Sequence, residues 1–595
     1  MPARPSGLRS RLGFALVALA ACQRDEAPAP VGSAPAAVSA PAPAPAPKVA
    51  PPGVAAAIRL LDAAVASLAT WNGCEAGAGY GSVRRALAAL EPFARTGARR
   101  ASEVLYGPPR AADEGAGAVG AIDTALADHA CEGVRAQRFQ IESALLLARH
   151  EIEDDRRLAD ARAAQLVSDA AYELGLALLA ARTSSSRFDE ADRGEALGLA
   201  DAVEAGATAL FPAPPDDLAH ALDELRALRA TVERAPLLTA VPDRARLARA
   251  TGGIGLAVRR AATARGLSVR GPHHAPAGTP DAAVSPLSLP PPRRPLDPEQ
   301  VALGARLFSD VRLSANNRRS CASCHDPARA YTEPRATPTS LDPSITLRRN
   351  TPTLLYDGLH ATQLWDGRIV TAETQALRVV HNRAELGLDD GELVARVKAD
   401  PAYAAAFAMQ KPSGVTAASI GVALGAYVAS LGSGTAPIDA YARGDDAALS
   451  PEARRGLDVF VGQGRCSRCH VPPLWGGSRP TDFAVSIYSV LGVPASADGR
   501  TRDDDPGRFD VTHRELDRGA FKTPTVRNIA RTAPYMHHGR YATLEQVVDF
   551  YDRGGGRGLG LTIPNQDPDV LPLRLSPADR KALLVFLREG LLDAR

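Results

Sequence analysis

The pattern Cys-x-x-Cys-His occurs twice in the C-terminal half of the chain, at Cys321–His325 and Cys466–His470. This pattern is typical of the covalent attachment site of a c-type haem. The two thiols add across the haem vinyl groups, and the adjacent histidine is then placed to ligate the iron. A redox-active cysteine pair and half of a zinc site are the alternatives, and the histidine that follows directly in both copies favours haem. The predicted haem-binding residues are Cys321, Cys324, His325, Cys466, Cys469 and His470.

The N-terminus predicts export from the cytoplasm. Arginines precede an apolar run over residues 12–21, which is too short to span a membrane in the mature protein. The run ends at Leu19–Cys22, a segment that resembles a bacterial lipobox, and this implies a signal peptide over residues 1–21 and a lipid on Cys22. An ordinary signal peptide cleaved nearby is the alternative. Because Gln23 replaces the aspartate associated with inner-membrane retention, we expect a periplasmic protein anchored to the outer membrane.

The composition of the rest of the chain predicts a mainly α-helical protein whose parts are connected by Pro-rich segments. Residues 22–53 form a Pro/Ala-rich tether, and residues 270–296 form a second Pro-rich linker. Residues 54–269 predict a bundle of six to eight helices, whose role the sequence does not indicate. Two copies of "helix, loop, Cys-x-x-Cys-His" predict cytochrome c-like domains over 297–445 and 446–595. The expected helices cover 54–69, 83–94, 136–152, 158–181, 298–308, 451–460 and 576–592.

Two further observations concern the net charge and the remaining cysteines. The formal net charge is +2, so no bulk field favours a nucleic acid as partner. Beyond the haem and lipid cysteines, only Cys74 and Cys131 remain, and in an oxidising compartment they could form one disulfide.

Several ordered motifs surround the haem motifs. They include Asn350–Leu354, Leu364–Arg368, Glu385–Gly387 and Phe521–Asn528. With these motifs, residues 297–595 resemble the bacterial di-haem cytochrome c peroxidase family, which includes the MauG-type enzymes. The resemblance does not extend to residues 1–290. It implies two haem domains, of which the first is peroxidatic and the second transfers electrons.

The resemblance assigns three residues to catalysis. Trp365 matches the tryptophan that lies between the two haems and relays electrons, with a buried structural aromatic as the alternative. Glu385 matches the distal glutamate, and peroxide cleavage needs such a group to take a proton from one oxygen and return it to the other. Gln375 matches the distal glutamine, a pocket hydrogen-bonding group. A surface carboxylate at a helix start is the alternative for Glu385.

The sequence departs from the family at the distal ligand of the first haem. Typical members carry a histidine between the first haem motif and the tryptophan, but residues 326–359 contain none, and His360 is too close to Trp365 to match it. We therefore expect the first haem, with His325 as its proximal ligand, to be open at rest, as in MauG-type enzymes.

The resemblance also suggests ligands for the second haem and for a calcium ion. Tyr551 stands where many members carry the axial methionine, and MauG-type members use a tyrosine there; Met536 is the competing ligand. A phenolate would stabilise the ferric state of the second haem, whose other ligand is His470. The expected calcium ligands are the Asn350 side chain and the carbonyls of Thr532 and Pro534, and such oxygen donors suit calcium.

Three functions are consistent with these residues. The first is a periplasmic peroxidase that reduces hydrogen peroxide with electrons from a small cytochrome c or a cupredoxin. The second is a MauG-like oxidase that uses peroxide to oxidise a protein substrate at long range, which Tyr551 and the missing distal histidine favour. The third is an electron-transfer lipoprotein without catalysis, against which Glu385 and Gln375 argue. Only the lipid on Cys22 would contact a membrane.

Overall fold

The structure of the protein is a computed structural model. It describes residues 52–71, 78–106, 131–153, 160–179, 189–236, 238, 241–269, 284–292, 295–410, 414–480, 483–495 and 499–594. The expected signal peptide, Cys22, nearly all of the tether and Cys74 lie outside these residues. Cys131 is disulfide-bonded, whereas none of the four cysteines of the haem motifs takes part in a disulfide.

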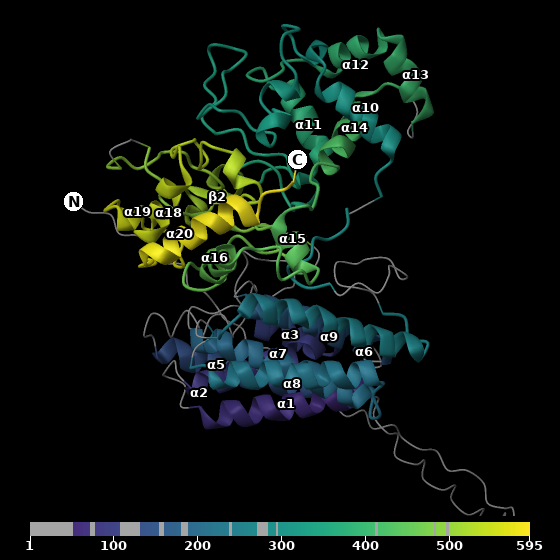
Figure 1. The fold of residues 1–595 in the computed structure, drawn as a ribbon, viewed down its shortest axis with the longest axis vertical. Coiled ribbons are helices and arrows are strands. Elements are labelled where there is room, and N and C mark those ends of the chain that lie inside the picture. The colour runs from purple at the N-terminus through teal and green to yellow at the C-terminus, as the bar shows by residue number, and fades with distance from the viewer. Residues whose placement is uncertain are drawn as a thin grey trace, which may run out of the picture. The chain divides into compact units, whose positions relative to one another are not determined.

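The N-terminal region forms a helical bundle, as predicted (Figure 1). Its apolar faces pack pairwise, with α2 along α7 and α6 against both α7 and α9. Helix α1 is long and apolar enough to cross a membrane by length and composition alone, but it buries Leu61 and Leu68 inside the bundle. The described helices are α1 (Pro52–Thr70), α2 (Ala78–Gly97), α3 (Arg99–Tyr106), α5 (Cys131–Glu153), α6 (Asp160–Leu178), α7 (Asp189–Leu210), α8 (Asp216–Arg234) and α9 (Arg244–Ala264).

The first haem domain is built on α10 and α14, which pack against each other. Asp297 caps α10 by accepting a hydrogen bond from the Glu299 amide, and Pro298 occupies the first turn, so the helix begins where the sequence predicts. The elements are α10 (Pro298–Phe308), α11 (Ala372–His381), α12 (Asp390–Lys398), α13 (Pro401–Met409), α14 (Ala417–Ala429) and α15 (Pro437–Ala442), with the first haem motif in the 3₁₀ turn η5 (Cys321–Ser323).

The second haem domain repeats this plan with α16 and α20 (Figure 1). Ser450 caps α16 and Ser576 caps α20, each followed by a proline, as expected. The closing helix is shorter than predicted, because regular α-helix ends at Val585 and a π-helical turn continues to Gly590. The elements are α16 (Pro451–Val461), η8 (Cys466–Arg468), β1 (Tyr488–Val490), α17 (Phe509–Thr512), β2 (Ala520–Lys522), α18 (Leu544–Asp552), α19 (Gly555–Gly558) and α20 (Pro577–Val585), and β1 pairs antiparallel with β2.

A glycine marks the same helix crossing in both haem domains. A Cβ atom on Gly304 of α10 would lie 2.0 Å from the Ala423 carbonyl oxygen of α14, and one on Gly456 of α16 would lie 2.0 Å from the Ala582 carbonyl oxygen of α20. Only glycine allows helix backbones to approach so closely. The two domains therefore share one architecture, the cytochrome c-like fold that the sequence predicts.

A buried charged cluster joins the two haem domains. Arg527 is fully buried and pairs with Asp439. Its guanidinium carbon lies 4.6 Å from the ring centre of Tyr356, whose hydroxyl donates to Asp593 at 2.7 Å. Tyr356 and Asp439 belong to the first domain, whereas Arg527 and Asp593 belong to the second. The cluster therefore connects the two haem domains.

The bundle contacts the second haem motif directly. The Ser467 hydroxyl, fully buried, donates to the Leu179 carbonyl oxygen at 2.6 Å, just past the end of α6. Arg468 donates to Asp192 of α7 at 2.7 Å. Arg249 of α9 adds an ion pair to Asp446 at 2.6 Å. Two of these contacts fall between the haem cysteines Cys466 and Cys469.

Candidate haem sites and the path between them

Both haem-motif histidines are held in the same tautomer. Nδ1 of His325 donates to the Tyr331 carbonyl oxygen at 2.9 Å, and Nδ1 of His470 donates to the Pro524 carbonyl oxygen at 3.0 Å. A carbonyl oxygen only accepts, so Nδ1 carries the proton and Nε2 keeps its lone pair. This arrangement is usual for a histidine that ligates a metal through Nε2.

Burial keeps these two histidines neutral, as a metal ligand must be. It lowers the pKa of His325 and lowers that of His470 to about 4. The cysteine thiols are also buried, and burial raises the pKa of Cys321 and Cys466 to about 12 each. The donor sets therefore fit two c-type haems, each with two thioether attachments and one imidazole ligand.

One of the two predicted distal residues lies near the first haem motif. Glu385 lies close enough to Cys321 for its charge to raise the pKa of that thiol. Burial raises the pKa of Glu385 itself, although its Oε1 accepts a hydrogen bond from Asn382 at 2.7 Å. The Oε1 atom of Gln375 on α11 is buried and has no hydrogen-bond partner among the described residues. A buried polar atom of this kind calls for a ligand or water that fills the pocket.

A cavity surrounds the second haem motif. Its lining includes Cys466, Cys469 and His470 of the motif together with Tyr551 and Met536. Burial raises the pKa of Tyr551 far above its usual value, and the nearby thiols of Cys469 and Cys466 raise it further. The structure thus brings both candidate axial ligands to the same cavity and does not choose between them.

Trp365 lies in a turn that joins the two domains. Its indole Nε1 donates to the Asn350 carbonyl oxygen at 2.8 Å, and its own carbonyl oxygen accepts from the Lys522 amide of β2 at 2.7 Å. The ring lines the second-haem cavity. Trp365 therefore contacts loops of both haem domains and lines the cavity of the second haem motif.

The turn around Trp365 is fixed by charge and by a required glycine. Asp366 is almost fully buried and accepts from Arg349 at 2.6 Å, and Arg349 also donates to Asp505 of the second domain at 2.7 Å. Gly367 has a φ of +65°, and a Cβ atom there would lie 1.8 Å from the Tyr488 hydroxyl oxygen of β1. This close approach holds the Trp-Asp-Gly-Arg motif against the second domain.

Sequence reasoning did not single out several residues of this region. Asp357 and Lys522 both line the cavity. Burial raises the pKa of Asp357 to about 7, while the charge of Lys522 opposes that rise, and burial lowers the pKa of Lys522. The His537 ring stacks on Phe521 at 3.7 Å between centroids and lies 6.4 Å from the Trp365 ring. No sequence pattern marks the Asp357–Lys522 pair.

His360 and the expected calcium ligands are also placed by the structure. Nδ1 of His360 lies 3.1 Å from the Ser478 hydroxyl of the second domain, and its ring lines the second-haem cavity. Asn350, Thr532 and Pro534 line this cavity together. Because the Asn350 amide nitrogen donates to the Arg335 and Ala336 carbonyl oxygens, the side-chain oxygen is its remaining ligand atom.

Comparison with known proteins agrees with this geometry. Residues 298–447 match the family model of the di-haem cytochrome c peroxidases. The chain is 33% identical over 309 residues to a cytochrome-c peroxidase, IdrP2, of Denitromonas iodatirespirans, a match that covers 49% of this chain and 80% of the relative. It is 35% identical over 310 residues to the methylamine utilization protein MauG of Methylorubrum extorquens, a match that covers 51% of this chain and 81% of the relative.

A third relative is the cytochrome c peroxidase Ccp of Escherichia coli, with 31% identity over 281 residues, 47% of this chain and 58% of the relative. The chain belongs to the di-haem cytochrome c peroxidase family. It is an oxidoreductase of the peroxidase type, and membership of the family implies two c-type haems.

Proposed function

We propose that the protein is a periplasmic peroxidase that reduces hydrogen peroxide to water with electrons from a small redox protein. The observation that carries this proposal is the pair of candidate distal groups in the first haem domain, a half-buried Glu385 near Cys321 and a buried Gln375 oxygen without a partner among the described residues. A protein that only transfers electrons has no need for either group. The balanced reaction takes one peroxide, two protons and two electrons to two waters.

Glu385 moves the protons in this proposal. When bound, the first haem supplies the iron to which peroxide binds and the electrons that cleave the O–O bond. Glu385, as carboxylate, would accept a proton from one peroxide oxygen and return it to the other, which leaves as water. The hydrogen bond from Asn382 at 2.7 Å orients the carboxylate, and Gln375 holds the substrate by a hydrogen bond.

Trp365 provides the path for electrons from the second domain. Its ring lines the second-haem cavity, and its backbone and indole are bonded to loops of both domains. An aromatic ring that is held in one position between two redox centres would keep the electronic coupling between them unchanged. A small cytochrome c or a cupredoxin would deliver electrons to the second haem.

A MauG-like oxidase is the alternative, and Tyr551 is the observation that favours it. The phenol reaches the second-haem cavity, and a ferric iron there would favour the phenolate that burial alone disfavours. The second haem would then retain oxidising equivalents, and an external protein would be the electron source. The absence of histidine from residues 326–359 is consistent with a first haem open to peroxide at rest.

Calcium and location complete the proposal. Asn350, Thr532 and Pro534 would hold one calcium ion between the haem domains, since all three line one cavity and offer oxygen atoms. Residues 1–21 would direct export, and a lipid on Cys22 would attach the mature protein to the periplasmic face of the outer membrane.

Adding stoichiometric peroxide to the fully oxidised, haem-loaded protein tests both candidate functions. The visible and near-infrared spectrum is recorded over time. A rapid and long-lived change at both haems supports the MauG-like alternative. A rapid change that a reduced cytochrome c reverses supports the peroxidase. No reaction until one haem is reduced would contradict the open first haem and leave a peroxidase that needs reductive activation.

A further inference from the structure

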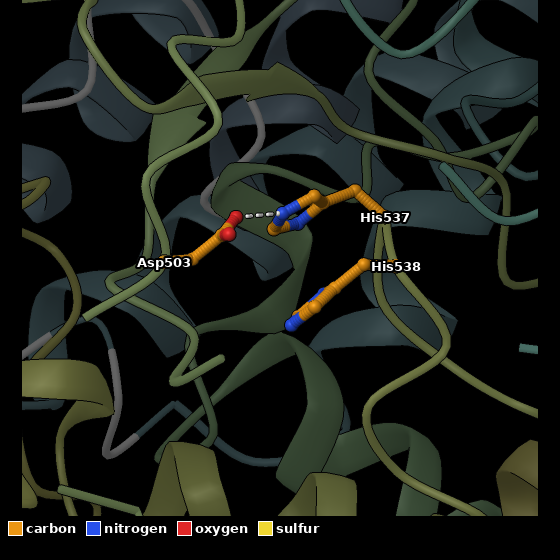
Figure 2. Close-up of side chains that lie close together, drawn as sticks. All are labelled: Asp503, His537 and His538. Atoms are coloured by element: carbon orange, nitrogen blue, oxygen red, sulfur yellow. Dashed lines mark hydrogen bonds and ion pairs between the residues drawn. The ribbon is translucent and has the colours of Figure 1, made fainter. Parts of the chain in front are cut away.

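Three side chains outside the haem attachments converge beside the second-haem cavity. Asp503, His537 and His538 each offer a ligand atom, and these atoms lie within 4.8 Å of one another (Figure 2). Nε2 of His537 lies 2.6 Å from Oδ2 of Asp503, and the two histidine rings are stacked with centroids 4.3 Å apart. Asp503 and His537 line the cavity, so the cluster borders it.

His538 is prepared as a ligand by its own hydrogen bond. Its Nε2 donates to the Pro494 carbonyl oxygen at 3.2 Å, so the proton sits on Nε2 and Nδ1 carries a lone pair. Nδ1 is buried and has no hydrogen-bond partner among the residues that the structure describes. A ring held through one nitrogen by a backbone carbonyl, with the other nitrogen unused, is the usual state of a metal-binding histidine.

His537 and Asp503 are held firmly as well. The ring of His537 stacks on Phe521, and its carbonyl oxygen accepts from the Asn350 amide at 2.6 Å. The cluster thus offers one carboxylate and two imidazoles to a cation.

We propose that Asp503, His537 and His538 bind one divalent transition-metal ion, of the class of Zn²⁺ or Cu²⁺. Two imidazoles and one carboxylate are donors that such ions accept, whereas calcium prefers oxygen alone. The ion takes the place of the proton between His537 and Asp503, and its fourth position is open to water. It is separate from the expected calcium site, which uses Asn350, Thr532 and Pro534.

The required movement is small. Zinc bonds to nitrogen and oxygen are about 2.0–2.2 Å long, so ligand atoms around a tetrahedral ion stand about 3.3–3.5 Å apart. The 2.6 Å contact between His537 and Asp503 has to open by less than about 1 Å, and atoms as far apart as 4.8 Å have to close by about 1.5 Å.

Metal titration of the haem-loaded, full-length protein tests the proposal. The protein is freed of metal with a chelator and returned to excess Ca²⁺, so that oxygen-donor sites are filled. Zn²⁺ is then titrated by calorimetry, and Cu²⁺ binding is followed by electron paramagnetic resonance. The four motif cysteines are bound to haem in this protein and do not compete. We expect one ion per chain and a copper spectrum with coupling to two nitrogens.

Two variants and one control variant test which residues bind the ion. His538→Ala should weaken binding at least about tenfold and leave the haem spectra unchanged. Asp503→Asn keeps the side-chain volume and should weaken binding as well, which covers the case that His538→Ala fails to fold. His381→Ala removes an exposed histidine that also pairs with a carboxylate, Asp390 at 2.8 Å, and should leave binding unchanged.

Three results would overturn the proposal. They are no stoichiometric binding of either ion, binding that Ca²⁺ displaces with equal affinity, and equal losses in His381→Ala and His538→Ala. None of these results depends on peroxide turnover, so they are distinguishable from a failure of the proposed function.

Discussion

The two haem motifs have the same local structure and different surroundings. In both, a 3₁₀ turn holds the first cysteine and a backbone carbonyl fixes the histidine through Nδ1. Between the cysteines of the first motif, Ser323 is exposed to solvent, whereas Ser467 in the second is fully buried against the bundle. The motif alone therefore determines how a haem is attached. Other parts of the chain determine how far the motif is exposed to solvent.

The pockets near the two haem motifs also differ in the residues that line them. Near the first motif lies Glu385, and Gln375 of the same domain holds a buried oxygen without a partner among the described residues, which is costly unless a ligand or water fills the site. The cavity of the second motif is lined by Tyr551 and Met536. Variants at four positions test whether the two pockets differ in chemistry as proposed.

The largest effect is expected for Glu385→Gln. Loss of the acid–base group should lower peroxide turnover about 10²–10⁴-fold, while the spectra of both haems stay unchanged. Because burial raises the pKa of Glu385, wild-type turnover should fall as the pH drops through that pKa, since a protonated Glu385 cannot accept the peroxide proton. This acid limb should be missing in the variant. Steady-state rates with a reduced cytochrome c measure both effects.

Glu299→Gln is the matched control, because Glu299 is an exposed carboxylate in the first turn of α10. It should leave turnover and its pH profile unchanged. If Glu385→Gln retains wild-type turnover, the first pocket has no acid–base residue at this position and the contrast between the pockets fails.

The second prediction concerns the axial ligand of the second haem. Tyr551→Phe should change the spectrum of that haem and raise its reduction potential by on the order of 0.1 V, within the roughly 0.8 V range that axial ligands set. The reason is that a phenolate stabilises the ferric state. Met536→Leu should change neither. Spectroelectrochemical titration separates the two variants, and the reverse result would make Met536 the ligand.

The third prediction concerns the turn that joins the pockets. Gly367→Ala places a residue with a Cβ atom at a φ of +65° and 1.8 Å from the Tyr488 hydroxyl. Strain and clash together should lower the free energy of unfolding by about 2–4 kcal/mol. Gly560→Ala is the control, because it introduces the backbone strain without the clash: a Cβ atom there has no neighbour within 4 Å among the described residues. It should lower the free energy of unfolding by only about 1 kcal/mol. Urea unfolding measures the difference, and equal losses would contradict it.

The sequence predicts best what depends on neighbours along the chain. Asp297, Ser450 and Ser576 each cap a helix whose start the sequence predicts, because a cap and the proline after it act within one turn. The tautomer of His470 could not be predicted, since its acceptor, Pro524, lies 54 residues away.

The same limit applies to the metal cluster and to the bundle. Asp503 lies 34 residues from His537, and no spacing rule connects them. Ser467 and Leu179 are 288 residues apart, so periodicity could predict the helices of the bundle but not the surface on which it packs. The distal roles of Glu385 and Gln375 were predicted only through family resemblance, because the burial of a side chain is a property of the fold.

The smallest effect compares the two haem motifs directly. Ser467→Ala leaves the Leu179 carbonyl oxygen without its buried donor, which should lower the free energy of unfolding by about 1–2 kcal/mol. Ser323→Ala removes only an acceptor for the Ser320 amide at an exposed position and should cost less than about 0.5 kcal/mol. Urea unfolding of the haem-loaded protein measures both. Equal losses would mean that the bundle adds no stability to the second motif, because the buried hydrogen bond is what distinguishes the two serines.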